Sequence, residues 1–334
     1  MRVGVIILNW NGRDLLERFL PSVVKYSGDH DIYLADNNST DDSVSYVEKS
    51  FPKVQIIKMK ENRGYAGGYN EAIHRVSNEL LCLVNSDVAV TEGWCDTIST
   101  FFSNDLSVGA AQPKILDYTY PNRFEYAGAA GGFLDRLAYP FCRGRIFNTL
   151  ESDSGQYNSS IEVDWASGAC LFIRKSVFLK AGSFDPDYFA HQEEIDLCWR
   201  IRKLGYKISI DATIRVYHMG GGTLSSLNPQ KTFYNFRNSL FNIVKNDSSQ
   251  EWWIILLLRM VLDGIAALKF VLEGKVSHFK AVLKAHISFY KNLKSMWRKR
   301  ILQKNRDLVN SKKSKVLFVV WQYFVKRKRY FHEL

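Results

Sequence analysis

The sequence is poor in cysteine, and its cysteines form no recognisable motif. Five are spread over 334 residues, and no two stand at the Cys-x-x-Cys spacing. An odd number of widely spaced cysteines argues against a disulfide framework and against a structural zinc site. We therefore expect reduced thiols and a cytoplasmic protein. The five are Cys82, Cys95, Cys142, Cys170 and Cys198.

Long uninterrupted hydrophobic runs are also missing. The chain opens directly with a predicted strand, Val3–Leu8, so we expect no signal peptide. The most apolar stretch, Trp252–Leu272, is interrupted by Arg259, Asp263 and Lys269. Charged residues at these positions argue against a transmembrane span.

Two common nucleotide-binding motifs are absent as well. The glycine-rich stretch Asn62–Gly68 does not match Gly-x-Gly-x-x-Gly, and no Lys-Ser or Lys-Thr pair follows it. Their absence disfavours nicotinamide cofactors and ATP hydrolysis. Glycines before a helix still allow backbone amides to approach a phosphate or a ring closely.

Acidic residues are scarce near the C-terminal end. Residues 291–334 contain 14 lysines and arginines but only two acidic residues, whereas the rest of the chain is close to neutral. A basic segment indicates an anionic partner, either membrane phospholipid or nucleic acid. From about residue 250 the pattern is helical and rich in Trp, Leu, Ile and Lys, which suits an interfacial helix. We favour an anionic membrane surface over nucleic acid. Packing on the catalytic domain, or a dimer contact, stays open as an alternative.

Strand and helix patterns alternate through the first half of the chain. Together with 46% apolar residues, this predicts a globular α/β fold with a mostly parallel sheet flanked by helices. We place this domain at residues 1–245 and a helical, basic extension at 246–334. Residues 105–165 lack a clear pattern and are predicted to be loops over one end of the sheet. The other predicted strands are Asp31–Ala35, Val54–Met59, Leu80–Val84, Ala169–Ile173, Tyr206–Asp211 and Arg215–His218. The predicted helices are Asp14–Lys25, a helix capped by Ser39 or Thr40 and ending at Lys49, one from Asn62–Gly68 to Val76, Ser176–Ala181 and Glu193–Leu204.

Polar side chains follow three of these strands. Leu80–Val84 stops at Asn85-Ser86-Asp87, and a carboxylate at the carboxyl end of a buried strand lies where open α/β sheets bind ligands. Asn85 and Asp87 offer oxygens suited to a divalent cation that also holds a diphosphate. An ordinary Asx turn is the competing interpretation.

The first two strands bring further polar groups to the same edge. They end in Asn9-Trp10-Asn11-Gly12 and Asp36-Asn37-Asn38. An acid after the second strand can hydrogen-bond a ribose hydroxyl or the edge of a pyrimidine. A turn followed by a helix start would explain Asp36 equally well.

Two later motifs also carry ionisable groups. Glu193 and Glu194 stand at a loop-to-helix junction, where they gain from the helix N-terminus or serve as a general base. Asp196 and Arg200 have the spacing of a structural i, i+4 pair. His218 ends a strand before three glycines, where it could ligate a metal or contact a phosphate.

The ordered set of motifs resembles the family 2 glycosyltransferases with a GT-A fold, especially the bacterial rhamnosyltransferase-like branch. The resemblance extends over residues 1 to about 240. The segments that carry it are Val5–Gly12, Asp36–Asp41, Asn62–Asn70, Asn85–Asp87, Trp165–Ala169, Gly182–Asp185, Glu193–Arg200 and His218.

The resemblance implies roles for individual residues. Asp36 would bind the nucleotide base, and Asp87 would hold Mn²⁺ or Mg²⁺ on the sugar-nucleotide diphosphate, with His218 as a metal or diphosphate ligand. Asn85 replaces the first acid of the family's Asp-x-Asp motif. Glu194 aligns with the catalytic base, with Glu193 as the alternative. The remaining expected donor contacts are Asn9, Trp10, Asn11, Asn38, Arg63, Gly64, Gly67, Asn70 and Ser86. The expected acceptor contacts are Trp165, Gly168, Phe189 and His191.

These roles imply an inverting, metal-dependent glycosyltransferase on the cytoplasmic face of a bacterial membrane. Its donor would be a dTDP- or UDP-sugar, and its acceptor a hydroxyl of a lipid-linked or cell-surface glycan for O-antigen, capsule or a similar polymer. A sugar-nucleotide pyrophosphorylase is disfavoured because no basic residue precedes Arg13 after the first strand. A catalytically silent sugar-nucleotide-binding scaffold at the membrane stays open as the alternative.

Overall fold

The computed structural model describes residues 1–220, 228–304 and 318–334. Within this part of the chain the main sheet has nine strands, in the order β11-β13-β6-β12-β4-β1-β2-β3, with β5 paired to β13. The first strands are mutually parallel, which confirms the predicted α/β architecture. They are β1 (Val3–Asn9), β2 (Asp31–Asp36), β3 (Gln55–Lys58) and β4 (Leu80–Asn85).

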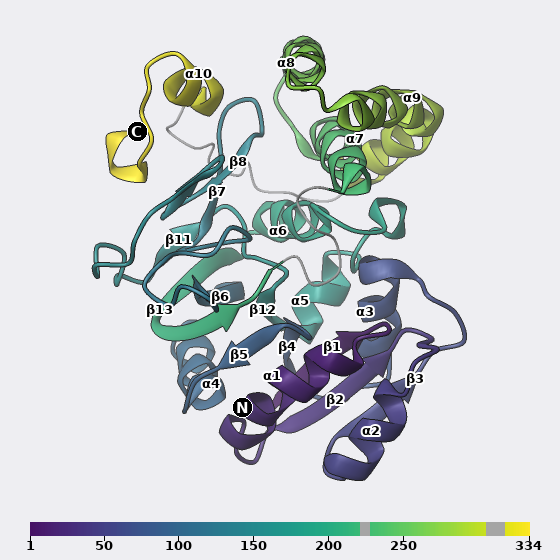
Figure 1. Ribbon diagram of the computed structural model, residues 1–334, viewed down its shortest axis with the longest axis vertical. Coiled ribbons are helices and arrows are strands. Elements are labelled where there is room, and N and C mark those ends of the chain that lie inside the picture. Colours follow the sequence, from purple (N-terminus) through teal and green to yellow (C-terminus); the bar gives the residue numbers. More distant parts are fainter. Residues whose placement is uncertain (221–227, 305–317) are drawn as a thin grey trace.

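Both faces of the parallel strands are buried, which is why their sequences are almost continuously apolar. On β1, Ile6 belongs to one hydrophobic cluster, whereas Val5 and Ile7 belong to the cluster on the other face. Helices cover both faces (Figure 1). They are α1 (Arg13–Tyr26), α2 (Ser43–Ser50), α3 (Gly64–His74), α4 (Trp94–Asn104), α5 (Lys175–Lys180) and α6 (Glu193–Lys203), with a short 3-10 turn, η1 (Pro186–Tyr188), before α6.

The prediction of loops over residues 105–165 is wrong. This region contributes β6 (Val108–Asp117), a strand that is buried along almost its whole length. Its sequence hides this because Gln112 and Lys114 interrupt the apolar pattern. Both are buried and satisfied by partners far along the chain, including Asp153 for Lys114. The region also adds β11 (Ile161–Val163) to the main sheet and forms a four-stranded sheet of its own. The strands of that sheet are β7 (Gly132–Leu134), β8 (Pro140–Cys142), β9 (Arg145–Ile146) and β10 (Thr149–Leu150).

Two further predictions need correction. The residues predicted as two short strands form one long strand, β13 (Lys207–His218), with an irregularity between Asp211 and Arg215. Neither Ser39 nor Thr40 caps α2, which begins at Ser43. The remaining strands are β5 (Val88–Val90) and β12 (Cys170–Arg174).

The C-terminal helices gather at one end of the molecule, away from β2 and β3 (Figure 1). Helix α7 packs against α6, α8 and α9. No helix in the described ranges is long and apolar enough to cross a membrane. The domain boundary at residue 245 stays a prediction. The helices are α7 (Pro229–Asn246), α8 (Trp252–Leu272), α9 (Val276–Lys304) and α10 (Val319–Phe324), followed by a 3-10 turn, η2 (Phe331–Glu333).

Helix α8 has an inverted polarity. Two of the three charged residues that interrupt its apolar sequence, Arg259 and Asp263, are buried, whereas Lys269 is exposed. Arg259 donates to the Leu137 carbonyl at 2.9 Å, and Asp263 lies 3.1 Å from His286 Nε2. The exposed side of α8 is therefore almost entirely apolar, the opposite of an ordinary surface helix.

Candidate functional site

The ends of β1 and β2 form the first part of the site. Register places Asn9 beside Asp36, and both side chains are buried. Asn9 Nδ2 donates to Asp36 Oδ1 at 3.3 Å and to Ser43 Oγ at 2.9 Å, while the Ser39 amide donates to Asp36 Oδ2 at 3.2 Å. Asn9 therefore braces the Asp36 carboxylate at the sheet edge. The neighbouring Trp10 is half exposed.

The loops after these strands are joined by asparagine side chains. Asn11 Oδ1 accepts from the Thr40 amide at 2.7 Å. Asn37, which sequence reasoning did not select, is buried and joins β2 to the start of α3. Its Nδ2 donates to the Gly64 carbonyl at 3.0 Å, and its Oδ1 accepts from the Arg63 amide at 3.0 Å. Asn38, the predicted residue, is exposed. The only feature of the sequence that could have indicated a role for Asn37 is its position directly after strand β2.

The glycine-rich start of α3 contacts the loop that precedes α6. Gly64 has φ of +66°, and a Cβ atom there would lie 2.7 Å from the Phe189 carbonyl oxygen. That oxygen accepts hydrogen bonds from the amides of Tyr65 at 3.0 Å and Ala66 at 3.3 Å. Only glycine meets both conditions, so this segment ties α3 to the predicted acceptor loop.

Three predicted donor contacts lie elsewhere. Arg63, Gly67 and Asn70 line a surface hollow of about 670 Å³, and neither Asp36 nor Asp87 belongs to its lining. The Asn70 amide group is committed to the Phe184 backbone, at 2.9 and 3.0 Å. A role for these three in donor binding stays a prediction.

A second cluster forms where β4 and β13 end. Asp87 Oδ1 lies 3.0 Å from His218 Nε2, and His218 Nδ1 lies 3.2 Å from Glu125 Oε2. All three side chains are buried. Burial alone would lower the pKa of His218, but the two carboxylates outweigh it and raise that pKa to about 10. No sequence pattern indicates a role for Glu125, because residues 105–165 are predicted to be loops.

The donor set at this cluster is compatible with a divalent cation. Two ligands at right angles, each about 2.1 Å from a cation, lie roughly 3.0 Å apart, which is the separation of Asp87 Oδ1 from His218 Nε2. Within the described ranges, no group of three His, Cys, Asp or Glu side chains has metal-binding geometry. Asp87 and His218 would supply two ligands of such a cation, and phosphate oxygens and water would have to complete the set. The glycines and threonine at 221–223 lie outside the described residues.

The third part of the site is the start of α6. Burial, and then the charge of Glu194, raise the pKa of Glu193 well above its usual value. Burial raises the pKa of Glu194 to about 7, although backbone amides at the helix start oppose the rise. The Oε2 atom of each carboxyl group is buried without a hydrogen-bond partner among the described residues. Such a pair is suited to accept protons near neutral pH.

The four predicted acceptor residues differ in their surroundings, and one of them, Trp165, is packed in the interior. A Cβ atom at Gly168 would lie 2.7 Å from the Tyr65 hydroxyl oxygen and 3.8 Å from Glu194 Cβ, so this glycine lies beside the glutamate pair and allows Tyr65 to approach. Phe189 stacks on Tyr234 with 5.7 Å between ring centroids. His191 Nε2 is buried and has no hydrogen-bond partner within the described part of the chain. Trp165 is buried, and its indole donates to the Phe133 carbonyl at 3.0 Å, which is a packing role.

The beginning of β12 connects these parts. The Asn85 amide donates to the Ala169 carbonyl at 3.0 Å, directly after Gly168. Ser167 Oγ donates to the Ala127 carbonyl at 2.5 Å, two residues from Glu125. Residues 167–169 therefore contact the segments that carry Asp87 and Glu125, and Gly168 between them lies beside Glu194 at the start of α6.

Helix α7 holds the loop that leads into α6 and its glutamate pair. Phe189, His191 and Gln192 all have positive φ, a costly conformation for residues other than glycine. Asn238 is buried, and its Nδ2 donates to the carbonyls of Tyr188, Ala190 and His191 at 3.2, 3.0 and 2.6 Å. This single amide group accordingly stabilises the strained loop.

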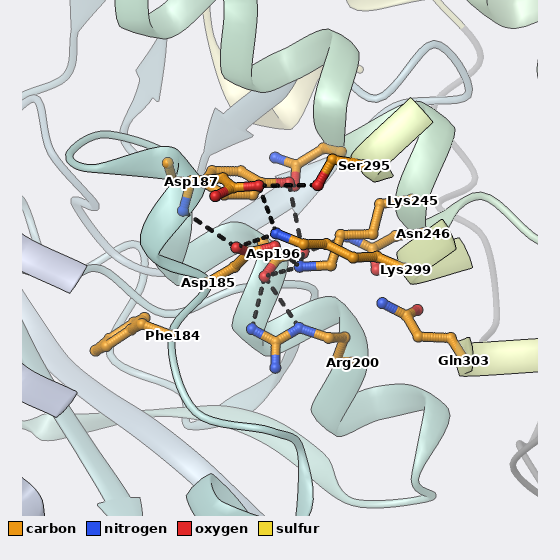
Figure 2. A network of polar contacts seen from close by, with 12 residues as sticks. Phe184, Asp185, Asp187, Asp196, Arg200, Lys245, Asn246, Ser295, Lys299 and Gln303 are labelled. Carbon is orange, nitrogen blue, oxygen red and sulfur yellow. Dashed lines mark hydrogen bonds and ion pairs between the residues drawn. The ribbon is translucent and has the colours of Figure 1, made fainter. Parts of the chain in front are cut away.

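A network of buried charges reinforces the same junction (Figure 2). Lys245 on α7 lies 2.7 Å from Asp185 and 2.8 Å from Asp196, and Lys299 on α9 lies 2.5 Å from Asp185. Arg200 pairs with Asp196 at 2.6 Å, which confirms the predicted structural pair. Burial would raise the pKa of Asp196, but the charges of Arg200 and Lys245 outweigh burial and lower that pKa.

Comparison with known proteins agrees with this architecture. The family model described as Glycosyl transferase family 2 matches residues 4–178, more than half of the chain. An N-acetylglucosaminyl-diphospho-decaprenol L-rhamnosyltransferase from Mycobacterium tuberculosis is 26% identical over 281 residues, covering 79% of this chain and 90% of the relative.

Solved glycosyltransferase structures share the fold. The mannosyltransferase PcManGT from Pyrobaculum calidifontis, in complex with GDP-Man and Mn²⁺, has a TM-score of 0.52 at 14% identity and covers 92% of this chain and 86% of its own. TarS 1–349 from S. aureus, in complex with UDP-GlcNAc, has a TM-score of 0.53 at 16% identity, with 93% and 95% covered. The predicted GT-A fold is thereby confirmed. The chain belongs to the family 2 glycosyltransferases.

Proposed function

We propose that the protein transfers a sugar, with inversion, from a dTDP- or UDP-sugar to a hydroxyl of a lipid-linked or cell-surface glycan. The observation that carries the proposal is the pair of carboxyl groups of Glu193 and Glu194, each with one buried oxygen that has no hydrogen-bond partner among the described residues. Glu194 lies beside Gly168, and the next residue, Ala169, accepts from the Asn85 amide at the end of the strand that leads to Asp87. The name of the mycobacterial relative, a rhamnosyltransferase acting on a diphospho-decaprenol acceptor, supports the acceptor class. Such a product would serve O-antigen, capsule or a related polysaccharide.

The mechanism follows from the roles of these groups. Asp36, braced by Asn9, recognises the nucleotide base. Glu194 accepts the proton of the acceptor hydroxyl as that oxygen attacks the anomeric carbon, and Glu193 keeps the alternative assignment. Attack from the face opposite the nucleotide inverts the anomeric centre in one displacement. Asp87 and His218 would hold Mn²⁺ or Mg²⁺, which offsets the charge of the leaving diphosphate.

The exposed face of α8 supports a place at the cytoplasmic surface of the plasma membrane. Nine apolar side chains on this helix are between 40% and 88% exposed, more than an ordinary water-facing helix presents. Helix α10 adds exposed aromatic residues at the same end of the molecule, followed by the basic run Lys326–Arg329 (Figure 1). Apolar side chains beside cations suit a surface of anionic lipid. The nine residues on α8 are Trp253, Ile254, Leu257, Leu258, Val261, Ile265, Leu268, Val271 and Leu272.

Vesicle binding tests the membrane proposal. Sedimentation with vesicles containing phosphatidylglycerol should capture the protein, and Leu257→Asp should weaken capture. Leu106→Asp, at an apolar residue that is 74% exposed outside these helices, is the matched control. Equal capture of both variants and the wild type would contradict a membrane role for α8.

A thermal-stability panel tests the donor site. UDP, dTDP and GDP are each added with Mn²⁺ or with EDTA. A ligand at about 100 times its dissociation constant should stabilise the fold by roughly 2.7 kcal/mol. We expect a metal-dependent shift with one base, abolished by Asp87→Ala. A folded protein that responds to no nucleotide would argue against the donor site. Nucleotide binding without any sugar transfer would favour the silent scaffold.

A further inference from the structure

One basic side chain, Lys231, lies near both halves of the site and forms no ion pair with the described residues. Lys231 is in the first turn of α7, which Asn228 caps by accepting from the Gln230 amide at 2.8 Å. The lysine is only partly exposed, and its Nζ lies 5.8 Å from the centroid of the Tyr126 ring. In the parts of the chain that the structure describes, no carboxylate lies within ion-pair distance of this ammonium group.

The neighbours of Lys231 belong to both parts of the site. On one side, Tyr126 directly follows Glu125, which lies 3.2 Å from His218. On the other side, the next turn of α7 carries Tyr234, which stacks on Phe189 and lies 6.3 Å from the His191 ring. The first two turns of α7 thus lie near Tyr126, the residue after Glu125, and near the predicted acceptor loop.

Electrostatics agree with this placement. Burial lowers the pKa of Lys231, and the charge of Glu125 opposes that change. Burial, followed by the charge of Lys231, lowers the pKa of His191 to about 4. The ammonium group therefore acts on both Glu125 and His191. A cation that is partly desolvated without an acidic partner costs free energy, which an anionic ligand can offset.

The charges of the Asp87 cluster create a need for such a cation. Asp87 and Glu125 are two carboxylates around a single imidazole. A diphosphate entering here meets negative side chains, and its charge grows further when it becomes the leaving group. A cation already fixed beside the cluster stabilises that charge without reorganisation.

We propose that Lys231 binds the diphosphate group of a substrate at this site and stabilises its charge during transfer. The inference rests on the proposed function. Two sources supply a diphosphate, the nucleotide donor and a prenyl-diphosphate-linked acceptor, and they share the chemistry that Lys231 would recognise.

Calorimetric titration separates the sources. The probes are UDP or dTDP, whichever the wild type binds, the matching monophosphate, and geranyl diphosphate. Lys231→Met should weaken binding of at least one diphosphate tenfold or more and leave the monophosphate unchanged. Loss for the nucleoside diphosphate alone assigns Lys231 to the donor, and loss for geranyl diphosphate alone assigns it to the acceptor. Lys231→Arg should retain most of the affinity because it keeps the charge.

Controls keep the test decisive. Lys53→Met removes an exposed lysine in the connection between α2 and β3, outside the residues assigned to this site, and should change no affinity. Urea denaturation checks that Lys231→Met remains folded. Unchanged diphosphate affinity in folded Lys231→Met, or equal weakening of diphosphate and monophosphate, overturns the inference and leaves the proposed function intact. A wild type that binds no nucleotide overturns the proposed function and this inference with it.

Discussion

Helix α6 carries two groups of buried acids, and they differ in how their charges are met. Asp196 is held by Arg200 and Lys245, so its pKa is lowered despite complete burial. Glu193 and Glu194, one turn earlier, have oxygens without partners in the described structure, and burial raises their pKa values. On the same helix, one acid is therefore paired within the fold, and two have the raised pKa values that we expect of groups available for chemistry.

The difference arises from what the surrounding elements supply. Helices α7 and α9 bring lysines to Asp196 and Asp185 (Figure 2), whereas the start of α6 faces Gly168 and Tyr65. A paired acid contributes to stability and no longer accepts a proton near neutral pH. An unpaired acid costs stability and retains that ability.

The largest expected effect is on activity. Glu194→Gln keeps the shape of the side chain but removes the base, so kcat for sugar transfer should fall by about 10²- to 10⁴-fold. The unfolding free energy should not decrease, because an unpartnered carboxyl group is removed. Glu48→Gln, at an exposed glutamate on α2, is the control. Full activity in Glu194→Gln would transfer the role of base to Glu193 or to another group.

The next largest effect is on stability. Asp196→Asn leaves Lys245 and Arg200 without their shared carboxylate and should lower the unfolding free energy by about 3–5 kcal/mol. Urea denaturation measures the loss. Asp105→Asn breaks an exposed pair with Lys207 and should cost at most about 1 kcal/mol. Similar losses in the two variants would contradict the structural role assigned to the buried network.

The two groups should also respond to pH in opposite directions. Because the folded-state pKa of Glu194 is about 7 against 4.5 in a model peptide, its contribution makes the protein less stable as pH rises between these values. The lowered pKa of Asp196 makes its contribution disappear as pH falls below its usual 3.8. Each unit of pKa difference corresponds to roughly 1.4 kcal/mol. Unfolding free energies of wild type and Glu194→Gln, measured from pH 4.5 to 8, should diverge in favour of the variant as pH rises.

The smallest effect concerns the loop that precedes α6. Asn238→Ala removes one amide group from three carbonyls and should cost about 1–2 kcal/mol of stability. Since Phe189, His191 and Gln192 are held in strained conformations, kcat should fall more than KM rises. Steady-state kinetics with denaturation of the same sample separates the two. An unchanged kcat in folded Asn238→Ala would show that the hydrogen bonds from Asn238 do not position the proposed base.

The sequence predicted those parts of the site that follow local patterns. Asn9 and Asp36 end apolar strands and Asp87 lies two residues beyond one, and parallel strands necessarily deliver their ends to one edge. The Asp196–Arg200 pair follows from helical spacing alone. These features depend on neighbouring residues, so a sequence reveals them.

Other features depend on partners far along the chain. Strand β6 was missed because Lys114 is buried against Asp153, a contact that no local pattern announces. Glu125 and Lys231 acquire their positions only when β6, β13 and α7 come together. The sequence predicts for α8 only an apolar helix interrupted by charges. In the structure, packing against other elements buries two of these charged residues, Arg259 and Asp263.

The contrast between the paired Asp196 and the two glutamates at the start of α6 is tested most directly by titrating the glutamate side chains themselves. Carboxyl resonances of protein labelled with ¹³C at the glutamate δ-carbon are followed from pH 3 to pH 9, in the wild type and in Glu194→Gln. The account predicts a resonance with a midpoint near 7 that disappears in the variant. If every glutamate titrates near the ordinary value of about 4.3, the start of α6 holds no carboxyl group prepared to act as a base.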